Sequence, residues 1–333
     1  MNTPPESGIR VPAQDIRTLV TALFEKAGTS REHAELMAKL LVQTDLRGIF
    51  SHGSWQTPVY VRNMLEGLIN PRPNVRVVRE NTTAQVLDGD GGMGHFPCYQ
   101  GTQWAIARAK EHGTAAVTTC NHHHFGAASK YTRTALEHDC IALAVSTHRY
   151  EIGPDGSILG IGGGSPLSFA MPAGEQPPFV PDMGMGLLPP SDGHDLFERA
   201  PWVYFKTMGV SIIPQLLGGV LAGIHKDEFK PPQSKWESNQ GSFISVFDVG
   251  SFMPVDELKA EMDRYMGQAR GLKPAPGYDS AELPGGLEWQ RQKDYARDGI
   301  PIGPEHQERL EGIGTELEVE TSFARYEHTR FGP

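Results

Sequence analysis

Cysteine is scarce in this sequence. The 333 residues include three cysteines, Cys98, Cys120 and Cys140, which lie far apart and form no C-x-x-C pair. Residues 1–7 also lack the charged-then-apolar pattern of a secretion signal. An odd number of cysteines without such a signal favours reduced thiols in the cytoplasm, and we expect all three to be buried structural thiols.

Basic clusters and long unbroken apolar runs are missing too. The formal net charge is −10, so the electrostatic footprint of a nucleic-acid-binding protein is absent. The longest apolar stretch, 208–224, contains Pro214 and several glycines, which makes it too short and broken to cross a membrane. We therefore expect neither nucleic acid nor a membrane as a partner, and we interpret 208–224 as a buried helix or an interface element.

Helical patterns open the chain. The apolar residues of the first helix recur at helical spacing, namely Ile16, Leu19, Val20, Leu23 and Phe24. Gly28 is expected to end this helix, and Thr29 with Glu32 is a candidate capping box for the next one. The buried stripe of that second helix comprises Ala34, Met37, Ala38, Leu41 and Val42. A third, short helix is predicted over 58–66, ended by Gly67.

The periodicity changes from Val75 onward. Strands are predicted at 75–78, 84–87, 115–119, 141–146 and 242–247, and helices at 103–111, 129–138, 255–267 and from Pro304. Trp104, Ile106 and Ala107 are expected on the inner side of the 103–111 helix, and 271–286, rich in proline and glycine, is expected to be a long loop. This alternation predicts an α/β protein.

The length fits one large domain or two closely joined ones, and a composition of 38% hydrophobic and 21% charged residues suits a soluble enzyme. We expect a helical N-terminal subdomain at 1–75, joined by a C-terminal helix at 300–333. An α/β domain at 76–299 would carry the substrate and the cofactor.

The segment 45–53, D-L-R-G-I-F-S-H-G, places a Ser-His pair at a glycine-marked turn after the second helix. A histidine at such a turn can be aimed into a cleft, and it titrates near neutrality. From chemistry alone, however, a turn histidine is more often a hydrogen-bonded structural residue. Motifs further along the chain change this balance.

Four further segments follow: D-G-D-G-G-M-G at 88–94, N-H-H-H-F-G-A-A at 121–128, G-G-G-S-P at 162–166 and D-M at 182–183. In this order and spacing the chain resembles the malate/L-lactate dehydrogenase family of the second, non-Rossmann type. The patterns that carry the resemblance are D-x-x-G-x-x-S-H-G, H-F-G-A-A, G-T-N-P and D-M, and it extends from about residue 12 to about residue 318.

The resemblance implies a fold and a cofactor that composition and spacing do not. The fold would be a mixed, largely antiparallel sheet with flanking helices, and the cofactor NAD or NADP. The glycine run at 160–165 is not G-x-G-x-x-G, and the chain begins with helices, so no Rossmann site is predicted.

The resemblance also implies an oxidoreductase acting on a small 2-oxo, 2-hydroxy or cyclic imino acid. His52 matches the acid/base residue, because reduction of a C=O or C=N group needs a positioned proton donor. Ser51 would orient it. His124 matches the histidine of H-F-G in the active-site wall and would orient the substrate. His123 and His148 occupy positions that the family fills with other polar residues, and they are candidate substrate-binding residues.

A substrate carboxylate needs a cation or hydrogen-bond donors, usually arginine because of its planar fork. Where the family often has the arginine of S-H-G-x-x-R, this chain has Gln56, a candidate specificity determinant. Arg47 is the nearest surrogate for the missing charge, with Arg62 and Arg149 as alternatives. A substrate other than a simple 2-oxo acid is the remaining explanation.

The cofactor-binding residues are implied by the resemblance as well. The residues that match a cofactor-contacting strand and turn are Asp182, Met183, Gly184 and Met185. Lys206 matches the lysine of a K-G motif, with Thr207 in place of the glycine. Glu288 and Arg291 are expected to touch the cofactor, with a surface role as the alternative. The segment between 182 and 206 is shorter than family members usually have, which predicts weaker dinucleotide binding.

Three adjacent histidines and an acidic turn raise the question of metal binding. Neighbouring residues on a strand point to opposite faces, so at most two of 122–124 can face one site. No His-Cys or His-Glu spacing supports zinc. Asp88 and Asp90 begin like a calcium loop, but the remaining EF-hand positions are missing. A tight turn whose glycines supply positive φ angles is favoured, and we expect no metal.

Two other functions remain open. One is a nicotinamide-independent lyase, isomerase or decarboxylase that uses the histidine cluster on the same scaffold. The other is a non-catalytic binding homologue. We also expect a homodimer, because 208–224 and the N-terminal helices offer more apolar surface than one chain covers, and symmetric dimers are the commonest oligomers.

Overall fold

The structure is a computed structural model that describes residues 3–149, 164–186, 197–224, 236 and 238–332. The chain divides into two compact units. The first comprises Met1–Pro73 and Ala269–Pro333, and the second comprises Asn74–Gln268. The segment 269–299, which the sequence analysis places in the α/β domain, belongs to the first unit.

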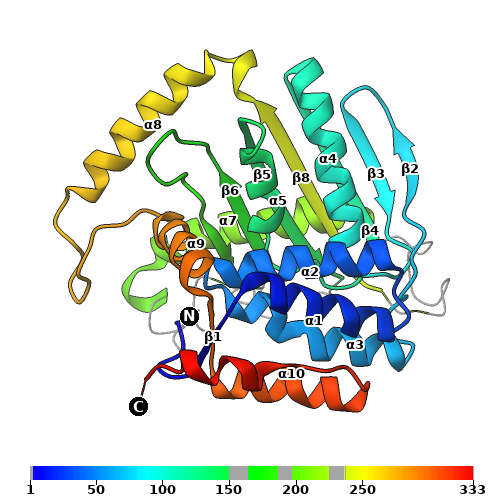
Figure 1. Cartoon of the computed structure of the whole chain (residues 1–333). Helices are drawn as coiled ribbons and strands as arrows, with labels where there is room; N and C mark the ends of the chain where they lie inside the picture. Colours follow the sequence, from blue (N-terminus) through cyan, green and yellow to red (C-terminus); the bar gives the residue numbers. More distant parts are fainter. Residues whose placement is uncertain (1–2, 150–163, 187–196, 225–235, 237, 333) are drawn as a thin grey trace. The chain divides into compact units, whose positions relative to one another are not determined.

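The first unit is built from helices of both ends of the chain, drawn in blue and in orange to red in Figure 1. Its helices are α1 (Ala13–Lys26), α2 (Arg31–Leu46), α3 (Thr57–Leu65), α9 (Gly286–Asp298) and α10 (Pro304–Glu316), with a 3₁₀ segment at Phe323–Thr329. The strands β1 (Ile9–Val11) and β9 (Ile300–Ile302) pair antiparallel. This pairing joins the two ends of the chain within one unit.

The predicted N-terminal helices are confirmed, but the capping box between them is wrong. The apolar residues of the α1 stripe are buried, and Gly28 follows α1 with a positive φ of 89°. The N-cap of α2 is Ser30, whose hydroxyl accepts a hydrogen bond from the backbone N–H of His33. Thr29 is buried instead, and its hydroxyl lies 3.5 Å from Met64 Sδ. Because the Thr29 hydroxyl is turned inward, it does not bond to the first turn of α2, and Ser30 is the N-cap instead.

The second unit contains a seven-stranded sheet in the order β2-β3-β4-β8-β5-β6-β7. The strands are β2 (Arg76–Glu80), β3 (Ala84–Asp88), β4 (Thr114–His122), β5 (Cys140–His148), β6 (Pro166–Ala170), β7 (Asp182–Gly184) and β8 (Gln240–Asp248). Only the β3–β4 pair is parallel among these described strands, and the other neighbours run antiparallel. The mixed, largely antiparallel sheet is therefore confirmed.

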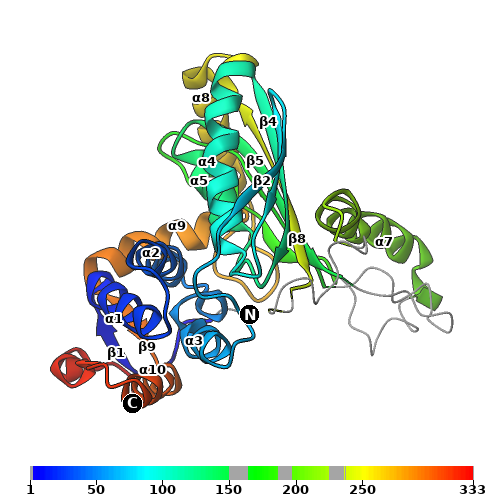
Figure 2. The ribbon, with the colours of Figure 1, turned by 90° about the vertical axis from the view of Figure 1, so that its right-hand side faces the viewer.

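Helices cover both faces of this sheet, as Figure 2 shows. One face packs against α4 (His95–His112) and α5 (Ser129–Leu136). The opposite face packs against α7 (Pro201–Gln215) and the π-helical turn that follows it, Leu216–Leu221. No helix in the described ranges is long and apolar enough to span a bilayer.

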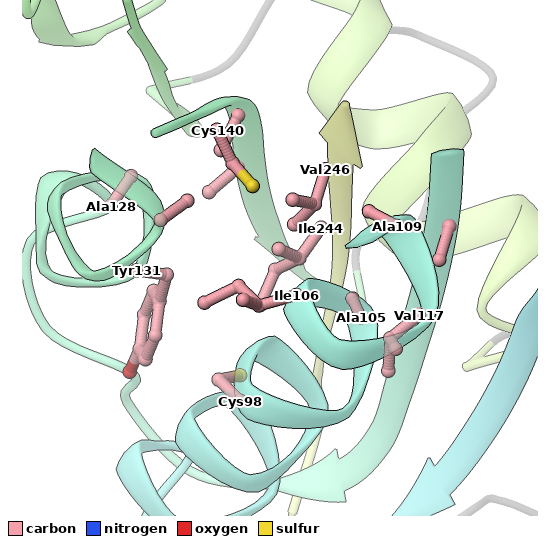
Figure 3. Packing of buried hydrophobic residues seen from close by; sticks show 14 of the residues in the cluster. Cys98, Ala105, Ile106, Ala109, Val117, Ala128, Tyr131, Cys140, Ile244 and Val246 are labelled. Atoms are coloured by element: carbon pink, nitrogen blue, oxygen red, sulfur yellow. The ribbon is translucent and has the colours of Figure 1, made fainter. Parts of the chain in front are cut away.

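The core of the second unit lies between the sheet and α4 and α5. In Figure 3 the side chains of Cys98 and Ile106 from α4, Tyr131 from α5 and Ile244 from β8 point toward one another. The helix α4 begins at His95, eight residues before the predicted start at 103. Pro97 is compatible with this earlier start, since proline is tolerated in the first turn of a helix. The prediction that Ala107 faces inward is wrong, since Ala107 is exposed.

The helix α8 (Val255–Arg270) follows β8 through a short 3₁₀ turn, Val249–Ser251. The carboxylate of Asp263 on α8 accepts hydrogen bonds from the backbone N–H groups of three consecutive residues, 174–176. These bonds hold the pKa of Asp263 below its usual value. They tie the loop after β6 to this helix.

Candidate active site

The Ser-His turn of the first unit begins where α2 ends. Two short 3₁₀ segments, Phe50–His52 and Ser54–Gln56, carry it. Ser51 Oγ and His52 Nδ1 lie 2.8 Å apart, which is hydrogen-bonding distance. Gln56 Nε2 donates a hydrogen bond to the carbonyl oxygen of Ser51 at 2.7 Å. The Gln56 amide therefore braces the turn that presents His52.

The spacing of D-x-x-G-x-x-S-H-G follows from contacts within this turn. Asp45 is fully buried at the end of α2, and its two carboxylate oxygens accept from the Ser54 backbone N–H at 3.2 and 3.0 Å. A Cβ on Gly53 would lie 1.7 Å from Asp45 Oδ1, so no larger residue fits there. Gly48 has a positive φ of 73°, which favours glycine. The aspartate and both glycines of the motif are thus required by the geometry of the turn.

A histidine of the C-terminal helix α10 also reaches this turn. His306 Nε2 lies 3.0 Å from Ser54 Oγ, and both side chains are buried. The imidazole of His306 packs edge-on against Trp55 with ring centroids 5.4 Å apart, and Arg309 lies over the Trp55 ring. Burial and the nearby Arg309 charge lower the pKa of His306 to about 3, so the ring is neutral at physiological pH.

Two arginines border the same turn. Arg47 is 8% exposed, and its Nε donates to Gln292 Oε1 on α9 at 3.1 Å. A Cβ on Gly48 would approach Arg291 Cδ to 2.8 Å, so the Arg291 side chain packs directly on that glycine. The structure therefore brings Arg47 and Arg291 to the turn that carries Ser51, His52 and Gln56.

The other candidates of the first unit lie elsewhere on its helices. Arg62 forms an exposed, two-bonded ion pair with Glu316 at 2.5 and 3.1 Å. This ion pair links α3 to α10. Glu288 is half-buried in the first turn of α9.

In the second unit the three adjacent histidines have different surroundings. His122 is fully buried, and its Nδ1 lies 2.8 Å from the carbonyl oxygen of His123. A carbonyl can only accept, so Nδ1 carries the proton, and Nε2 accepts from the Thr119 hydroxyl at 2.7 Å. Burial lowers the pKa of His122 to about 4, which keeps it neutral. His122 is therefore a structural residue.

The proton of His122 fixes the direction of a buried hydrogen-bond chain. Since Thr119 donates to His122, it accepts from Ser242 at 2.6 Å, and Ser242 in turn accepts from Cys98 at 3.2 Å. Burial raises the pKa of the Cys98 thiol to about 11, so the thiol keeps the proton that it donates. All three cysteines are free and buried, as predicted.

The glycine-rich segment 88–94 forms a tight turn around His122. A Cβ on Gly94 would lie 2.6 Å from His122 Nδ1, and Gly91 has a positive φ of 66°. Asp88 accepts from Arg76 and from Asn121 Nδ2, each at 2.7 Å. Among the residues that the structure describes, no group of three or more His, Cys, Asp and Glu is arranged to hold a metal ion.

His123 and His124 are half-buried at the end of β4. Burial lowers the pKa of His123 to about 4, and its Nε2 is buried without a hydrogen-bond partner among the described residues. The fully buried His95 and the nearly buried Lys130 of α5 both pack against Gly126, two residues after His124. Burial, with the nearby charges of Lys130 and His124, lowers the pKa of His95 well below its usual value.

The predicted cofactor strand is β7, an edge strand of the sheet. Met183, Gly184 and, on α7, Lys206 are exposed. Asp182 accepts from the backbone N–H of Ser129 at 3.0 Å, which joins β7 to the start of α5. Met185 is 2% exposed, so its side chain packs inside the unit.

The remaining candidates of this unit lie beside β5. His148 is exposed at the end of β5 and Arg149 follows it, with its backbone N–H donating to Asn239 at 2.5 Å. Arg149 Nη1 is buried without a hydrogen-bond partner in the described ranges. Of the G-G-G-S-P motif at 162–166, residues 162 and 163 lie outside the described residues.

Two residues at these sites carry no sequence signal that singles them out. His306 lies about 250 residues from Ser54, on a helix of mostly polar residues. Lys130 stands in an ordinary helical segment, and only the fold places it against His95. Neither local periodicity nor motif spacing can predict such contacts.

The chain is similar to known dehydrogenases over nearly its whole length. The malate dehydrogenase of Pyrococcus horikoshii is 27% identical over an alignment 351 positions long, and the match covers 95% of this chain and 97% of that protein. The L-sulfolactate dehydrogenase of Methanocaldococcus jannaschii is 26% identical over an alignment 332 positions long, and the match covers 90% of this chain and 95% of that protein. The solved structure of the P. horikoshii OT3 malate dehydrogenase matches with a TM-score of 0.81 at 27% identity, covering 94% of this chain and 97% of that one.

The fold and its relatives define an enzyme of the dehydrogenase class with a non-Rossmann sheet. A family model described as malate/L-lactate dehydrogenase matches residues 11–192 and 188–311. The chain belongs to this malate/L-lactate dehydrogenase family. The two matched segments meet at 188–192, inside the stretch where the sequence analysis places a shortened connection.

Proposed function

We propose that this protein is a nicotinamide-dependent dehydrogenase that interconverts a small 2-hydroxy acid and the corresponding 2-oxo acid. The observation that carries the proposal is the Ser51–His52 pair, with Oγ and Nδ1 2.8 Å apart in a turn fixed by a buried aspartate. Related proteins named malate and L-sulfolactate dehydrogenases act on acids of this class.

His52 is the proposed proton donor. In the protonated imidazole both ring nitrogens are donors, so Nδ1–H bonds to Ser51 Oγ and Nε2–H is the proton proposed to pass to the substrate. Giving the Nε2 proton to the substrate oxygen leaves a neutral ring that still donates from Nδ1 to Ser51. In the oxidation direction the neutral Nε2 takes the hydroxyl proton back. The Ser51 hydroxyl can accept from Nδ1–H or donate to an unprotonated Nδ1, so it can stay bonded to His52 in either state of the ring.

The second unit offers groups that suit a dinucleotide. β7 is an edge strand with exposed Met183 and Gly184, so its backbone and an apolar side chain are accessible. Lys206 presents an exposed ammonium group, which suits a phosphate. When bound, the nicotinamide supplies or removes the hydride at the substrate carbon. Because the Met185 side chain is buried and Asp182 bonds to Ser129, we propose that these two residues shape the strand more than they touch the ligand.

An acid substrate needs positive charge, and Arg47 with Arg291 at the Gly48 turn are the proposed source. A guanidinium binds a carboxylate through two parallel hydrogen bonds. In the second unit, His123 Nε2 is a buried polar atom without a partner in the described residues, which supports its proposed role in substrate binding. His124, His148 and Gln56 remain candidates for contact with the substrate, with one Gln56 N–H already donated to the Ser51 carbonyl. Glu288 remains a candidate for contact with the cofactor.

The test is turnover followed by absorbance of the reduced cofactor. Oxidised and reduced forms of both dinucleotides are combined with a panel of 2-hydroxy acids, 2-oxo acids and cyclic imino acids. The proposal predicts oxidation of at least one 2-hydroxy acid that has a second acidic group. Cofactor-independent consumption of the acids, with no change in cofactor absorbance, would favour the lyase or isomerase alternative.

We also propose that the protein is a homodimer joined through α7 and the turn that follows it. This segment buries polar Ser211 and Gln215 while exposing large apolar side chains, namely Trp202, Phe205, Val210, Ile213, Leu216, Val220 and Leu221. An exposed apolar surface of this kind marks an interaction site. These exposed side chains argue against a buried helix at 208–224 and support the proposal that the segment is an interface element.

A cytoplasmic location completes the proposal. All three thiols are free and buried, so the fold does not depend on an oxidising compartment. Fractionation of the native host cell, with detection of the protein in the cytoplasmic fraction, tests this point.

A further inference from the structure

We propose that His306 is a positioning residue for the reaction: through Ser54 it fixes the turn that aims His52. The inference rests on the proposed function, because it assumes that His52 exchanges a proton with the substrate. His306, Ser54 and His52 all belong to the first unit, so the contacts involved are internal to that unit.

Ser54 is the residue through which the turn is held. Its backbone N–H is bound by the Asp45 carboxylate of α2, and its hydroxyl is bound by His306 Nε2 of α10 at 3.0 Å. Ser54 is fully buried and lies two residues after His52. Backbone and side chain are therefore fixed from two different helices, close to the reacting imidazole.

Steric contacts leave the turn little freedom. Gly53 has no room for a Cβ beside Asp45, and Trp55 packs edge-on against the His306 ring. The residues on both sides of Ser54 are thus in contact with the same two elements, α2 and α10. Movement of His306 would be transmitted to Ser54 and Trp55, and from them to His52.

Such control matters because proton transfer requires a heavy-atom separation of roughly 2.6–3.2 Å. A misplacement of about 1 Å costs on the order of 10²-fold in rate. A histidine is suited to holding this turn, since its Nε2 reaches Ser54 from α10 while its ring packs beside Trp55. A purely space-filling role would need only the ring volume.

The experiment compares kcat, KM and the unfolding midpoint of four test variants and one control variant with those of the wild type. His306→Leu keeps bulk and removes the hydrogen bond, whereas His306→Gln places an amide near the position of Nε2. Ser54→Ala removes the other partner, and Ser54→Ala/His306→Leu completes a double-mutant cycle. Glu316→Gln is the matched control, because it alters an α10 contact with Arg62 that lies outside the turn.

We expect His306→Leu to lower kcat by about 10–100-fold with KM for the dinucleotide unchanged. His306→Gln should keep most of the wild-type kcat. The kcat of the double variant should be no lower than that of the slower single variant, and the kcat of Glu316→Gln should match the wild type. Coupled residues give such non-additive effects.

Two results would overturn the inference while leaving the proposed function intact. One is wild-type kcat in folded His306→Leu and Ser54→Ala. The other is a pair of losses that add in the double variant. If the wild type itself turns over no acid with either dinucleotide, the proposed function fails first, and this inference fails with it.

Discussion

At the residue scale, His52 carries the chemistry of the account. Replacing it with alanine removes the proton donor, and loss of one positioned acid/base group lowers the rate by about 10²–10⁴-fold. Steady-state kinetics of His52→Ala, with circular dichroism to verify the fold, measures this effect. His33→Ala is the control, because His33 lies on α2 in the same unit but outside the turn. Near-normal turnover by folded His52→Ala would remove His52 from the mechanism.

The residues of the motif could be predicted from the sequence, whereas their partners could not. Asp45, Gly48, Gly53 and His52 stand at fixed spacing, and the resemblance singles them out. The contact of Ser54 with His306 depends on the fold of a helix from the other end of the chain. The Ser30 cap was missed for a local reason, since Thr29 and Ser30 both have capping side chains and only burial distinguishes them.

At the element scale, the turn between α2 and α3 depends on one glycine. In Gly53→Ala the new Cβ would lie 1.7 Å from Asp45 Oδ1, so the carboxylate must move and its bonds to Ser54 weaken. We expect a loss of about 1–3 kcal/mol in the free energy of unfolding, the usual cost of overpacking, with reduced kcat. Denaturant unfolding measures the first quantity.

Gly312→Ala on α10 is the matched control for that substitution, because a Cβ at Gly312 meets nothing within 4 Å. It should be neutral or add about 0.4–1 kcal/mol of stability. Equal stability of Gly53→Ala and the wild type would show that the turn yields at little cost, contrary to the proposed rigidity.

The apolar face of α7 gives a second prediction at this scale. Val220→Glu/Leu221→Glu places two charges on side chains that are 58% and 59% exposed. If this face joins two copies, light scattering should show a dimer for the wild type and a monomer for the variant. Leu272→Glu, a charge at another exposed leucine, should leave the dimer intact. A monomeric wild type at micromolar concentration would contradict the interface.

Elements with strong periodicity were predicted, and elements without it were not. α1 and α2 have clear buried stripes, while α9 buries only Gly286 and Tyr295 and gives no stripe to recognise. β1 and β9 are three residues long and nearly 290 residues apart, so only the folded chain shows their pairing. The family resemblance predicted that the large sheet is mixed and largely antiparallel. It did not predict the strand order, which only the folded chain shows, because strand periodicity does not specify neighbours.

At the scale of the whole molecule, buried neutral histidines should make stability depend on pH. Burial lowers the pKa of His306 to about 3 and those of His122 and His123 to about 4, whereas an unfolded histidine titrates near 6.5. Between pH 6.5 and 4 the unfolded chain therefore binds more protons, and the free energy of unfolding falls as the pH falls. Each unit of pKa depression is worth about 1.36 kcal/mol.

Denaturant titrations at several pH values between 7.5 and 4 check this prediction. The depressed pKa of Asp263 acts in the same direction at the acidic end of the range. Above pH 7 these histidines are neutral in both states and contribute no slope. His306→Gln should show a shallower decline than the wild type, and a free energy of unfolding that is constant from pH 7 to pH 4.5 would contradict the assignment of buried neutral histidines.

The measurement that tests the central claim most directly is calorimetric titration of the wild type and Lys206→Ala with NADH and NADPH. The account predicts saturable binding of at least one dinucleotide to the wild type. If the Lys206 ammonium contacts a phosphate, its loss should weaken that binding by about 1.5–3 kcal/mol. No detectable binding of either dinucleotide at millimolar concentration would contradict the account and favour a nicotinamide-independent reaction on this scaffold.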